Sequence, residues 1–340
     1  MWVPRTFPPL RKINSLIFHY RTQRWRWNRA FRDGPEVIPH RPIYLLGTQN
    51  GGLTLLARIL HRHPDAVSAT GDHRHWAGED ELQDALRDIL PEDFGWRRVT
   101  LPGFPSDSHG WLYATPDFLP HYRRTAAQAD PAVAARYRAI LGRVLRMNAG
   151  ERASRARFVD KSQTLTLRVG QMQASLPDSP PVFVMLSRNP YAMVWSQAQK
   201  NGTVRALDLP IERKVELCAW HWRNSHEAAL EDAAADPAIR LRHWRFEDLL
   251  ADPAMVLKEI CAFCDLRWNP AILPGPTDRL PWGSRSDALN RRKWYPLRPD
   301  VNARALAELP DWALRVIEDI CSPLAARLGY DGRTERCLQC

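Results

Sequence analysis

Three things are scarce in this 340-residue sequence: lysine, cysteine and long apolar runs. No stretch approaches the roughly 18 apolar residues that span a bilayer, and the short apolar stretch at 13–18 lacks a cleavage site, so we expect neither a transmembrane helix nor a signal peptide. Six cysteines are too few for a disulfide scaffold. Two CxxC pairs, Cys261/Cys264 and Cys337/Cys340, would suit zinc, but we favour packing because the first pair lies in an apolar helical run.

Only six of the 48 cationic residues are lysine, and the formal net charge is +10. Arginine binds phosphate and sulfate with two parallel hydrogen bonds, but the abundance of alanine beside it indicates codon bias as the main cause of the excess. The cations are spread along the chain and interrupted by acids, whereas nucleic-acid binders concentrate them in a stripe, so we expect no nucleic-acid partner.

The chain divides into three predicted parts. Residues 1–38 are basic and aromatic and predict an appended helical extension, which would contact an anionic membrane surface through residues 10–32 or pack on the domain. Residues 39–331 form the main domain, and residues 332–340 form a C-terminal tail.

Short apolar runs alternate with segments of helical periodicity in the main domain. The run at 43–46 predicts a buried strand, followed by a glycine turn and a helix from residue 53. The pattern predicts an α/β fold with a central parallel sheet flanked by helices. Further strands are expected at 157–159, 182–186 and 239–246, and helices at 131–149, 164–175, 190–200, 211–234, 253–264 and 311–328.

The sequence GTQNGGLT at 47–54 has the spacing of the phosphate-cradling loop GxxxxGK[ST], with Leu53 in place of lysine. Its glycines would let backbone N–H groups surround an anion, and the following helix would point its positive end at the same place. Without the lysine that neutralises the β- and γ-phosphates, ATP or GTP hydrolysis is not expected. A tight turn without a ligand is the alternative.

Two further motifs suit phosphate. Arg188 lies just beyond the strand expected at 182–186, and Ser196 lies on the following helix, so both would face the sheet edge where ligands bind in open parallel sheets. The segment 290–295 is a basic-aromatic loop that offers cations for phosphate and a ring for a base. An ion pair with packing for the first motif, and a solvated surface for the second, are the alternatives.

In this order, the three motifs resemble those of the sulfotransferases that use 3′-phosphoadenosine 5′-phosphosulfate. Other stretches are also similar: DKSQ at 160–163 to the family's Glu-Lys-Thr-Pro element, WRFEDLLADP at 244–253 to its RYEDLLADP stretch, and ICSPL at 320–324 with LGY at 328–330 to its closing helix. The resemblance covers about 42–331. It implies a P-loop NTPase-like sulfotransferase fold, transfer of a sulfuryl group to a hydroxyl or amine, and no metal.

The resemblance also implies roles for single residues. Backbone amides of the loop and the Thr54 hydroxyl would hold the 5′-phosphosulfate, Arg188 and Ser196 would hold the 3′-phosphate, and the basic loop would close over it. The implied co-substrate-binding residues are Gln49, Asn50, Gly51, Gly52, Leu53, Thr54, Arg188, Ser196, Arg291, Arg292, Lys293 and Trp294.

The sequence departs from the family at the loop, where Asn50 replaces the usual lysine or arginine and Gly51 the usual serine. Lys161 would compensate from the next strand end as a catalytic cation. Asp72 is the predicted base by alignment, with His73 behind it; the alternative is a helix cap and a surface histidine.

The sequence leaves the acceptor open between a glycan, a glycolipid or lipid and a small metabolite. A bacterial-type cytoplasmic enzyme, peripheral to the membrane if the extension contacts it, fits the resemblance. Two other functions remain open: a non-catalytic relative that binds the nucleotide or a glycan, which Asn50 favours, and a P-loop kinase, which Leu53 disfavours.

Overall fold

The computed structural model describes most of the main domain and part of the N-terminal extension. The described residues are 20, 23–29, 33–70, 81–95, 99–102, 112–200, 202–205, 207–275, 297 and 299–330.

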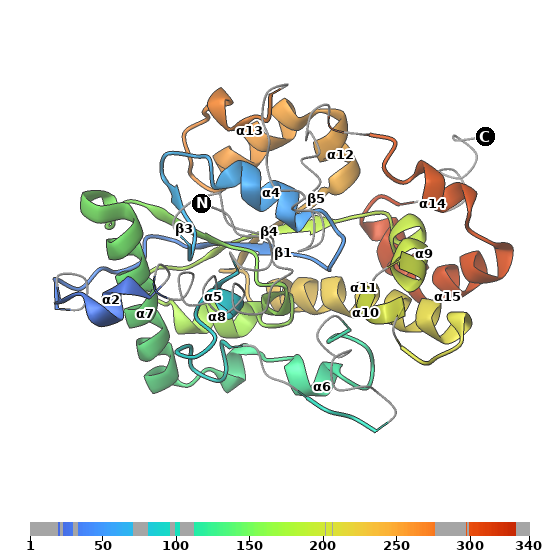
Figure 1. The fold of residues 1–340 in the computed structure, drawn as a ribbon, viewed down its shortest axis with the longest axis horizontal. Helices are drawn as coiled ribbons and strands as arrows, with labels where there is room; N and C mark the ends of the chain where they lie inside the picture. Colours follow the sequence, from blue (N-terminus) through green and yellow to red (C-terminus); the bar gives the residue numbers. More distant parts are fainter. Residues whose placement is uncertain are drawn as a thin grey trace, which may run out of the picture.

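Five parallel strands form one sheet at the centre of the molecule (Figure 1). Their order is β2-β3-β1-β4-β5, so the first strand of the chain lies in the middle of the sheet. The strands are β1 Ile43–Leu46, β2 Ala66–Val67, β3 Arg157–Asp160, β4 Val182–Ser187 and β5 Arg240–Arg245. The predicted α/β fold with a parallel sheet is therefore confirmed.

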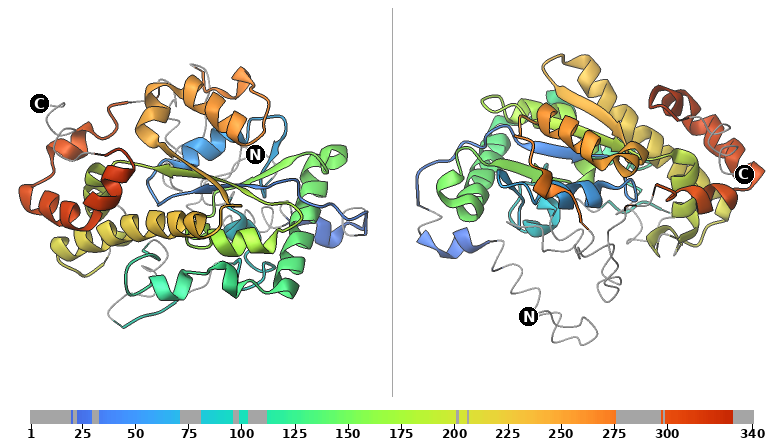
Figure 2. Two further views of the ribbon diagram at one scale, coloured as in Figure 1. Left: turned by 180° about the vertical axis from the view of Figure 1, so that it is seen from behind. Right: turned by 90° about the horizontal axis from the view of Figure 1, so that it is seen from above.

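Helices cover both faces of the sheet, as Figures 1 and 2 show. On one face lie α4 Leu53–Leu60, α12 Phe246–Ala251 and α13 Pro253–Phe263; on the other lie α7 Pro131–Ala149, α8 Val169–Ser175, α9 Pro190–Lys200, α11 Ile211–Ala235 and α15 Asp311–Arg327. The short helices are α2 Arg24–Trp27, α5 Leu82–Ala85, α6 Leu119–Tyr122, α10 Gly202–Arg205 and α14 Ala303–Ala307, with 3₁₀ turns at Ala126–Gln128, Gly150–Arg152, Gln163–Leu167 and Pro270–Ile272.

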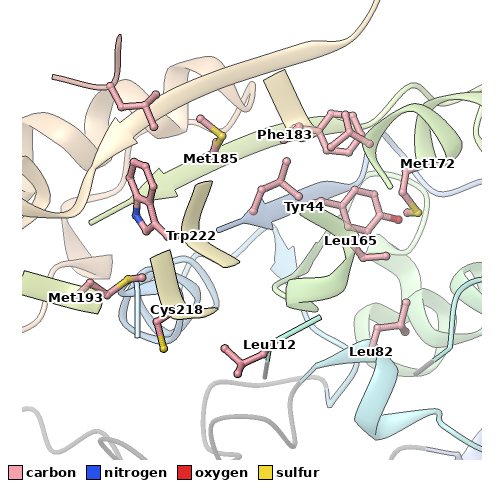
Figure 3. Packing of buried hydrophobic residues seen from close by; sticks show 14 of the residues in the cluster. Tyr44, Leu82, Leu112, Leu165, Met172, Phe183, Met185, Met193, Cys218 and Trp222 are labelled. Atoms are coloured by element: carbon pink, nitrogen blue, oxygen red, sulfur yellow. The ribbon is translucent and has the colours of Figure 1, made fainter. Parts of the chain in front are cut away.

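Strand β1 is apolar throughout because both of its faces are buried. Alternate side chains of a strand point to opposite faces. Ile43 and Leu45 of β1 therefore join the apolar cluster beneath α4, whereas Tyr44 and Leu46 join the larger cluster on the other face. Figure 3 shows part of that larger cluster, including Tyr44 and its neighbour Phe183. A sheet buried in this way holds the ends of its strands at fixed positions.

The prediction of a helix over 164–175 is wrong for the first half of this segment. The chain instead forms the 3₁₀ turn Gln163–Leu167, leaves helical geometry at Arg168, and starts α8 one residue later. The Thr166 hydroxyl bonds to both backbone groups of Gly47, at 2.9 Å from its nitrogen and 3.1 Å from its oxygen. This contact with the loop after β1 competes with a regular helix.

The described part of the N-terminal extension packs on α7 through Trp25 and through the backbone of Pro35 and Val37, which contact Arg146 and Gly142. Trp25 of α2 is buried, and the guanidinium of Arg143 on α7 lies 5.2 Å from its ring. Among the helices in the described ranges, none has the length and apolar character needed to cross a bilayer.

Candidate active site

The loop after β1 is shaped by its own backbone and by the neighbouring elements. Gly51 N–H donates to the Thr48 carbonyl at 3.0 Å, which closes a turn, and Asn50 adopts a left-handed conformation with φ of 66°. Asparagine tolerates this region better than most residues. The Thr48 hydroxyl lies 3.5 Å from the sulfur of Met193 on α9, so the loop is tied to both α9 and the 3₁₀ turn that holds Gly47.

Gly52 begins α4 in a conformation and a space that only glycine fits. Its φ is 94°, and a Cβ atom there would lie 2.2 Å from the ring of Phe246. The first-turn N–H groups of a helix have no intrahelical acceptor. Among the described residues, no acceptor bonds to the N–H of Gly52, Leu53 or Thr54. The start of α4 therefore offers donors to an anion, supported by the helix dipole.

The side chain of Leu53 points into the core and not toward these donors. Leu53 is only 2 % exposed and belongs to the apolar cluster between α4 and the sheet. Asn50 is exposed, and Thr54 is half-buried. The loop thus presents backbone amides and small polar side chains to an anion, without a cation at position 50 or 53.

Arg188 supplies the cation that the loop lacks. It follows β4 directly, and its Nη1 donates to the carbonyl of Asn50 at 3.1 Å. Burial lowers the pKa of Arg188, while the Glu247 carboxylate acts in the opposite direction. Because a guanidinium pKa starts above 12, the group stays charged at neutral pH. Its Cζ lies 5.7 Å from the ring of Phe246, the same ring that packs on Gly52.

Ser196 lies on α9, two turns beyond Arg188, and is half-buried. The Asn189 side chain accepts from Ala192 N–H at 3.1 Å and so caps the start of this helix. Within the described residues, the structure brings Arg188 but not Ser196 into hydrogen-bond contact with the loop.

In addition to this arrangement of the loop, α4 and Arg188, the sequence of the chain matches the profile of a protein family. The profile of the Sulfotransferase family matches residues 42–270, which is more than half of the chain. The chain belongs to the Sulfotransferase family.

Solved sulfotransferase structures are similar over most of their length, at low identity. The sulfotransferase domain from the curacin biosynthetic pathway is 16% identical, covers 87% of this chain and 99% of its own, and has a TM-score of 0.47. Sulfotransferase STF9 from Mycobacterium avium is 14% identical, with coverage of 92% and 82% and a TM-score of 0.49. The sulfotransferase domain of the Synechococcus PCC 7002 olefin synthase is 18% identical, with coverage of 84% and 96% and a TM-score of 0.45. No curated protein matches the chain.

The second predicted cation, Lys161, is engaged in an ion pair. Its ammonium lies 2.7 Å from Glu81 Oε1, and both side chains are largely buried. The neighbouring Asp160 accepts from Leu82 N–H at 2.8 Å, and burial raises the pKa of this carboxyl group. The segment that begins at Glu81 is therefore fastened to the end of β3, beside β1.

Six predicted site residues lie outside the described residues and stay predictions. They are Asp72, His73, Arg291, Arg292, Lys293 and Trp294.

Sequence reasoning missed several residues that contact the predicted ones or support such contacts. Glu247 and Tyr330 lie inside stretches that resemble the family, but the resemblance assigned them no role. Glu81 and Asn302 belong to no motif, and no signal in a single sequence marks them. Asn302 Oδ1 accepts from Arg188 Nε at 2.8 Å, and so it contacts the predicted phosphate ligand directly.

Proposed function

We propose that this member of the Sulfotransferase family transfers a sulfuryl group from 3′-phosphoadenosine 5′-phosphosulfate to a hydroxyl or amine of an acceptor. The observation that carries the proposal is the contact of Arg188 with the Asn50 carbonyl, beside the donors at the start of α4. Two anion-binding groups side by side, with an apolar Leu53 in the place of the nucleotide lysine, suit a donor that carries two phosphates and no triphosphate.

The chain's own residues would divide the work by position. The N–H groups of residues 52–54 would hold the 5′-phosphosulfate, and the half-buried Thr54 would add its hydroxyl. Arg188 and Ser196 would hold the 3′-phosphate. The acceptor oxygen or nitrogen would bond to the sulfur as the bond from sulfur to the bridging phosphate oxygen breaks, so that 3′-phosphoadenosine 5′-phosphate leaves. A base, for which Asp72 is the candidate, would take the proton of the acceptor.

Lys161 would act on developing negative charge only after its contact with Glu81 is rearranged or shared. A buried ammonium paired at 2.7 Å with a carboxylate has part of its charge compensated. The pair would thus place the lysine at the β3 end while restraining it. The acceptor of the reaction would be a glycan, a lipid or a small metabolite.

Calorimetric titration tests the donor class. We expect 3′-phosphoadenosine 5′-phosphate to bind at least tenfold more tightly than ATP, with no requirement for Mg²⁺. Arg188→Ala should remove most of that preference, because a charge-assisted bidentate contact is lost. Equal affinity for the two nucleotides in the parent protein contradicts the proposal.

A second candidate is a relative that binds the nucleotide without transferring sulfate. The exposed Asn50, where family members carry a cation, and the engaged Lys161 favour this alternative. Transfer of labelled sulfate across pools of glycans, lipids and small metabolites distinguishes the two: tight nucleotide binding with no labelled product supports the binding-only relative.

We also propose that the N-terminal extension contacts an anionic membrane from the cytoplasmic side. Residues 1–38 contain eight cations and two acids, a net charge of +6 out of the chain's +10. Trp27 is 69% exposed and Tyr20 61% exposed, as interfacial aromatics require. Figure 1 places α2 at the opposite end of the molecule from α9 and α14, so contact there leaves the candidate site open.

Co-sedimentation with vesicles tests the membrane contact. We expect binding to vesicles rich in phosphatidylglycerol, little binding to phosphatidylcholine, and a severalfold loss for Trp27→Ala. Met255→Ala, which removes another exposed apolar side chain, serves as the control because Met255 lies on α13. Equal binding to both vesicle types, or no effect of Trp27→Ala, contradicts the contact.

A further inference from the structure

Arg188 is held in place by a buried amide that is itself held by a carboxylate. Arg188 Nε donates to Asn302 Oδ1 at 2.8 Å, and Asn302 Nδ2 donates to Glu247 Oε1 at 2.6 Å. Asn302 is only 4% exposed. A guanidinium can only donate and an ionised carboxylate can only accept, so the two partners fix which way the amide of Asn302 faces.

Glu247 is fixed in turn by donors from two other parts of the chain. Its Oε1 accepts from Asn189 N–H at 2.9 Å, and its Oε2 accepts from the Tyr330 hydroxyl at 3.1 Å. Together with Asn302, three donors surround this one carboxylate. Such a set of partners leaves the carboxylate little freedom of rotation.

Tyr330 reaches Glu247 because of the turn that ends α15. Gly329 has φ of 79°, and the N–H of Tyr330 returns to the Ala325 carbonyl at 2.9 Å, which is the pattern of a glycine-ended helix. The Cζ atom of Arg245 lies 4.5 Å from the centroid of the Tyr330 ring. The C-terminal turn and the end of β5 therefore both support the position of Glu247.

The contacts of Arg188 leave part of its donor capacity for a ligand. Besides Nε, its Nη1 donates to Asn50 O and its Nη2 donates to Val301 O at 3.3 Å. A guanidinium has five N–H groups. Among the described residues three are used, so one N–H on each terminal nitrogen remains, which is the number that a bidentate phosphate contact needs.

We propose that Asn302 is a positioning residue that holds Arg188 in the orientation that binds the 3′-phosphate of the donor, with Glu247 and Tyr330 as its support. The inference rests on the proposed function. An arginine that is already ordered loses less conformational entropy when the phosphate binds, so the effect appears in affinity for the 3′-phosphate.

Two substitutions separate this role from simple packing. Asn302→Ala removes both hydrogen bonds and part of the volume, whereas Asn302→Leu removes the hydrogen bonds and keeps a similar shape. Both should weaken the binding of 3′-phosphoadenosine 5′-phosphate by about tenfold. Affinity for adenosine 5′-phosphate, which lacks the 3′-phosphate, should change by less than about twofold because its contacts lie elsewhere.

The matched control is Asn269→Ala. Like Asn302, Asn269 directly precedes a short helix, but its side chain accepts from Ala271 N–H at 3.0 Å and its turn lies in another part of the chain. This variant should retain the parent affinity for both nucleotides. Calorimetry gives the affinities, and the thermal midpoint of each variant shows that the comparison is made between folded proteins.

The outcomes are distinguishable. If the parent protein binds 3′-phosphoadenosine 5′-phosphate and adenosine 5′-phosphate equally, the proposed function fails, and the inference fails with it. If the parent prefers the 3′-phosphorylated nucleotide and both Asn302 variants keep that preference, the proposed function stands and the positioning role is wrong. A loss in Asn302→Ala that Asn302→Leu restores indicates packing and overturns it as well.

Discussion

Substitution of Gly52 by alanine places a methyl group where the structure has an aromatic ring. The new Cβ would lie 2.2 Å from the Phe246 ring, so the ring or the loop must move. A left-handed conformation costs a residue other than glycine about 1–2 kcal/mol. Forcing an extra carbon into a packed core adds about 1–3 kcal/mol. We therefore expect Gly52→Ala to lower the free energy of unfolding by about 2–5 kcal/mol.

Gly329→Ala separates the two contributions. Gly329 also has a positive φ, 79° against 94°, but a Cβ there would meet only ordinary contacts, the nearest being Arg245 Cδ at 3.5 Å. This variant should lose only the conformational part, about 1–2 kcal/mol. Urea unfolding followed by tryptophan fluorescence measures both values under the same conditions.

The reasoning is refuted if the two glycine variants are equally destabilised. A second check is the pair Gly52→Ala with Phe246→Leu, in which the smaller side chain makes room for the methyl group. Residues in contact should show a coupling energy of about 1–2 kcal/mol in such a cycle. Gly52→Ala should also weaken nucleotide binding, because the displaced ring lies 5.7 Å from the guanidinium of Arg188.

Three further outcomes are expected. Asn50→Lys, which restores the family's cation, should tighten the binding of 3′-phosphoadenosine 5′-phosphate about fivefold in calorimetry. The affinity of the control variant Asn50→Gly should stay within about twofold of the parent's, and equal affinities of the two variants contradict the prediction. Asp232→Ala should lower the free energy of unfolding in urea by about 3 kcal/mol, because Asp232 accepts from Arg123 at 2.6 and 2.8 Å and from Gly170 N–H at 2.8 Å. The control is Glu231→Ala, which changes an exposed neighbour and should cost less than about 0.5 kcal/mol. The free energy of unfolding should fall as the pH drops from 6.5 to 4, because histidines of the unfolded chain bind protons that the buried histidines of the folded protein do not bind. At pH 5 each buried histidine should account for a loss of about 2 kcal/mol. A free energy of unfolding that stays constant over this pH range contradicts the prediction. Burial lowers the pKa of His221 to about 3 and that of His226 and His243 to about 4.

The fold was predictable where burial on both faces dictates the sequence. The run VFVML at 182–186 can only be a fully buried strand in this context, and the structure extends β4 by one residue to Ser187. The segment at 164–175 was less readable, because the bond between Thr166 and Gly47 joins parts of the chain 119 residues apart. The local hydrophobic periodicity does not reveal a contact between residues so far apart in the sequence.

The candidate site was predictable where a motif is continuous in sequence. The strand, glycine turn and helix around residues 43–60 were expected, and so was the position of Arg188 at a strand end. The partners of the charged groups were not, because an ion pair such as Lys161 with Glu81 forms between residues 80 apart. Whether a predicted cation is unengaged or compensated depends on such partners, so its chemistry needs the structure.

The buried side chain at position 53 also limits which mutational routes are open to this chain. Leu53→Lys would restore the sequence of the usual nucleotide-binding motif, but the new side chain would lie in the apolar layer between α4 and the sheet. Burial of an unpaired ion costs several kcal/mol, a large share of the stability of a typical domain. A gain of triphosphate chemistry would therefore require compensating changes in the core before it could benefit the active site. Selection for a stable interior thus preserves the absence of that lysine, independently of any selection on the reaction.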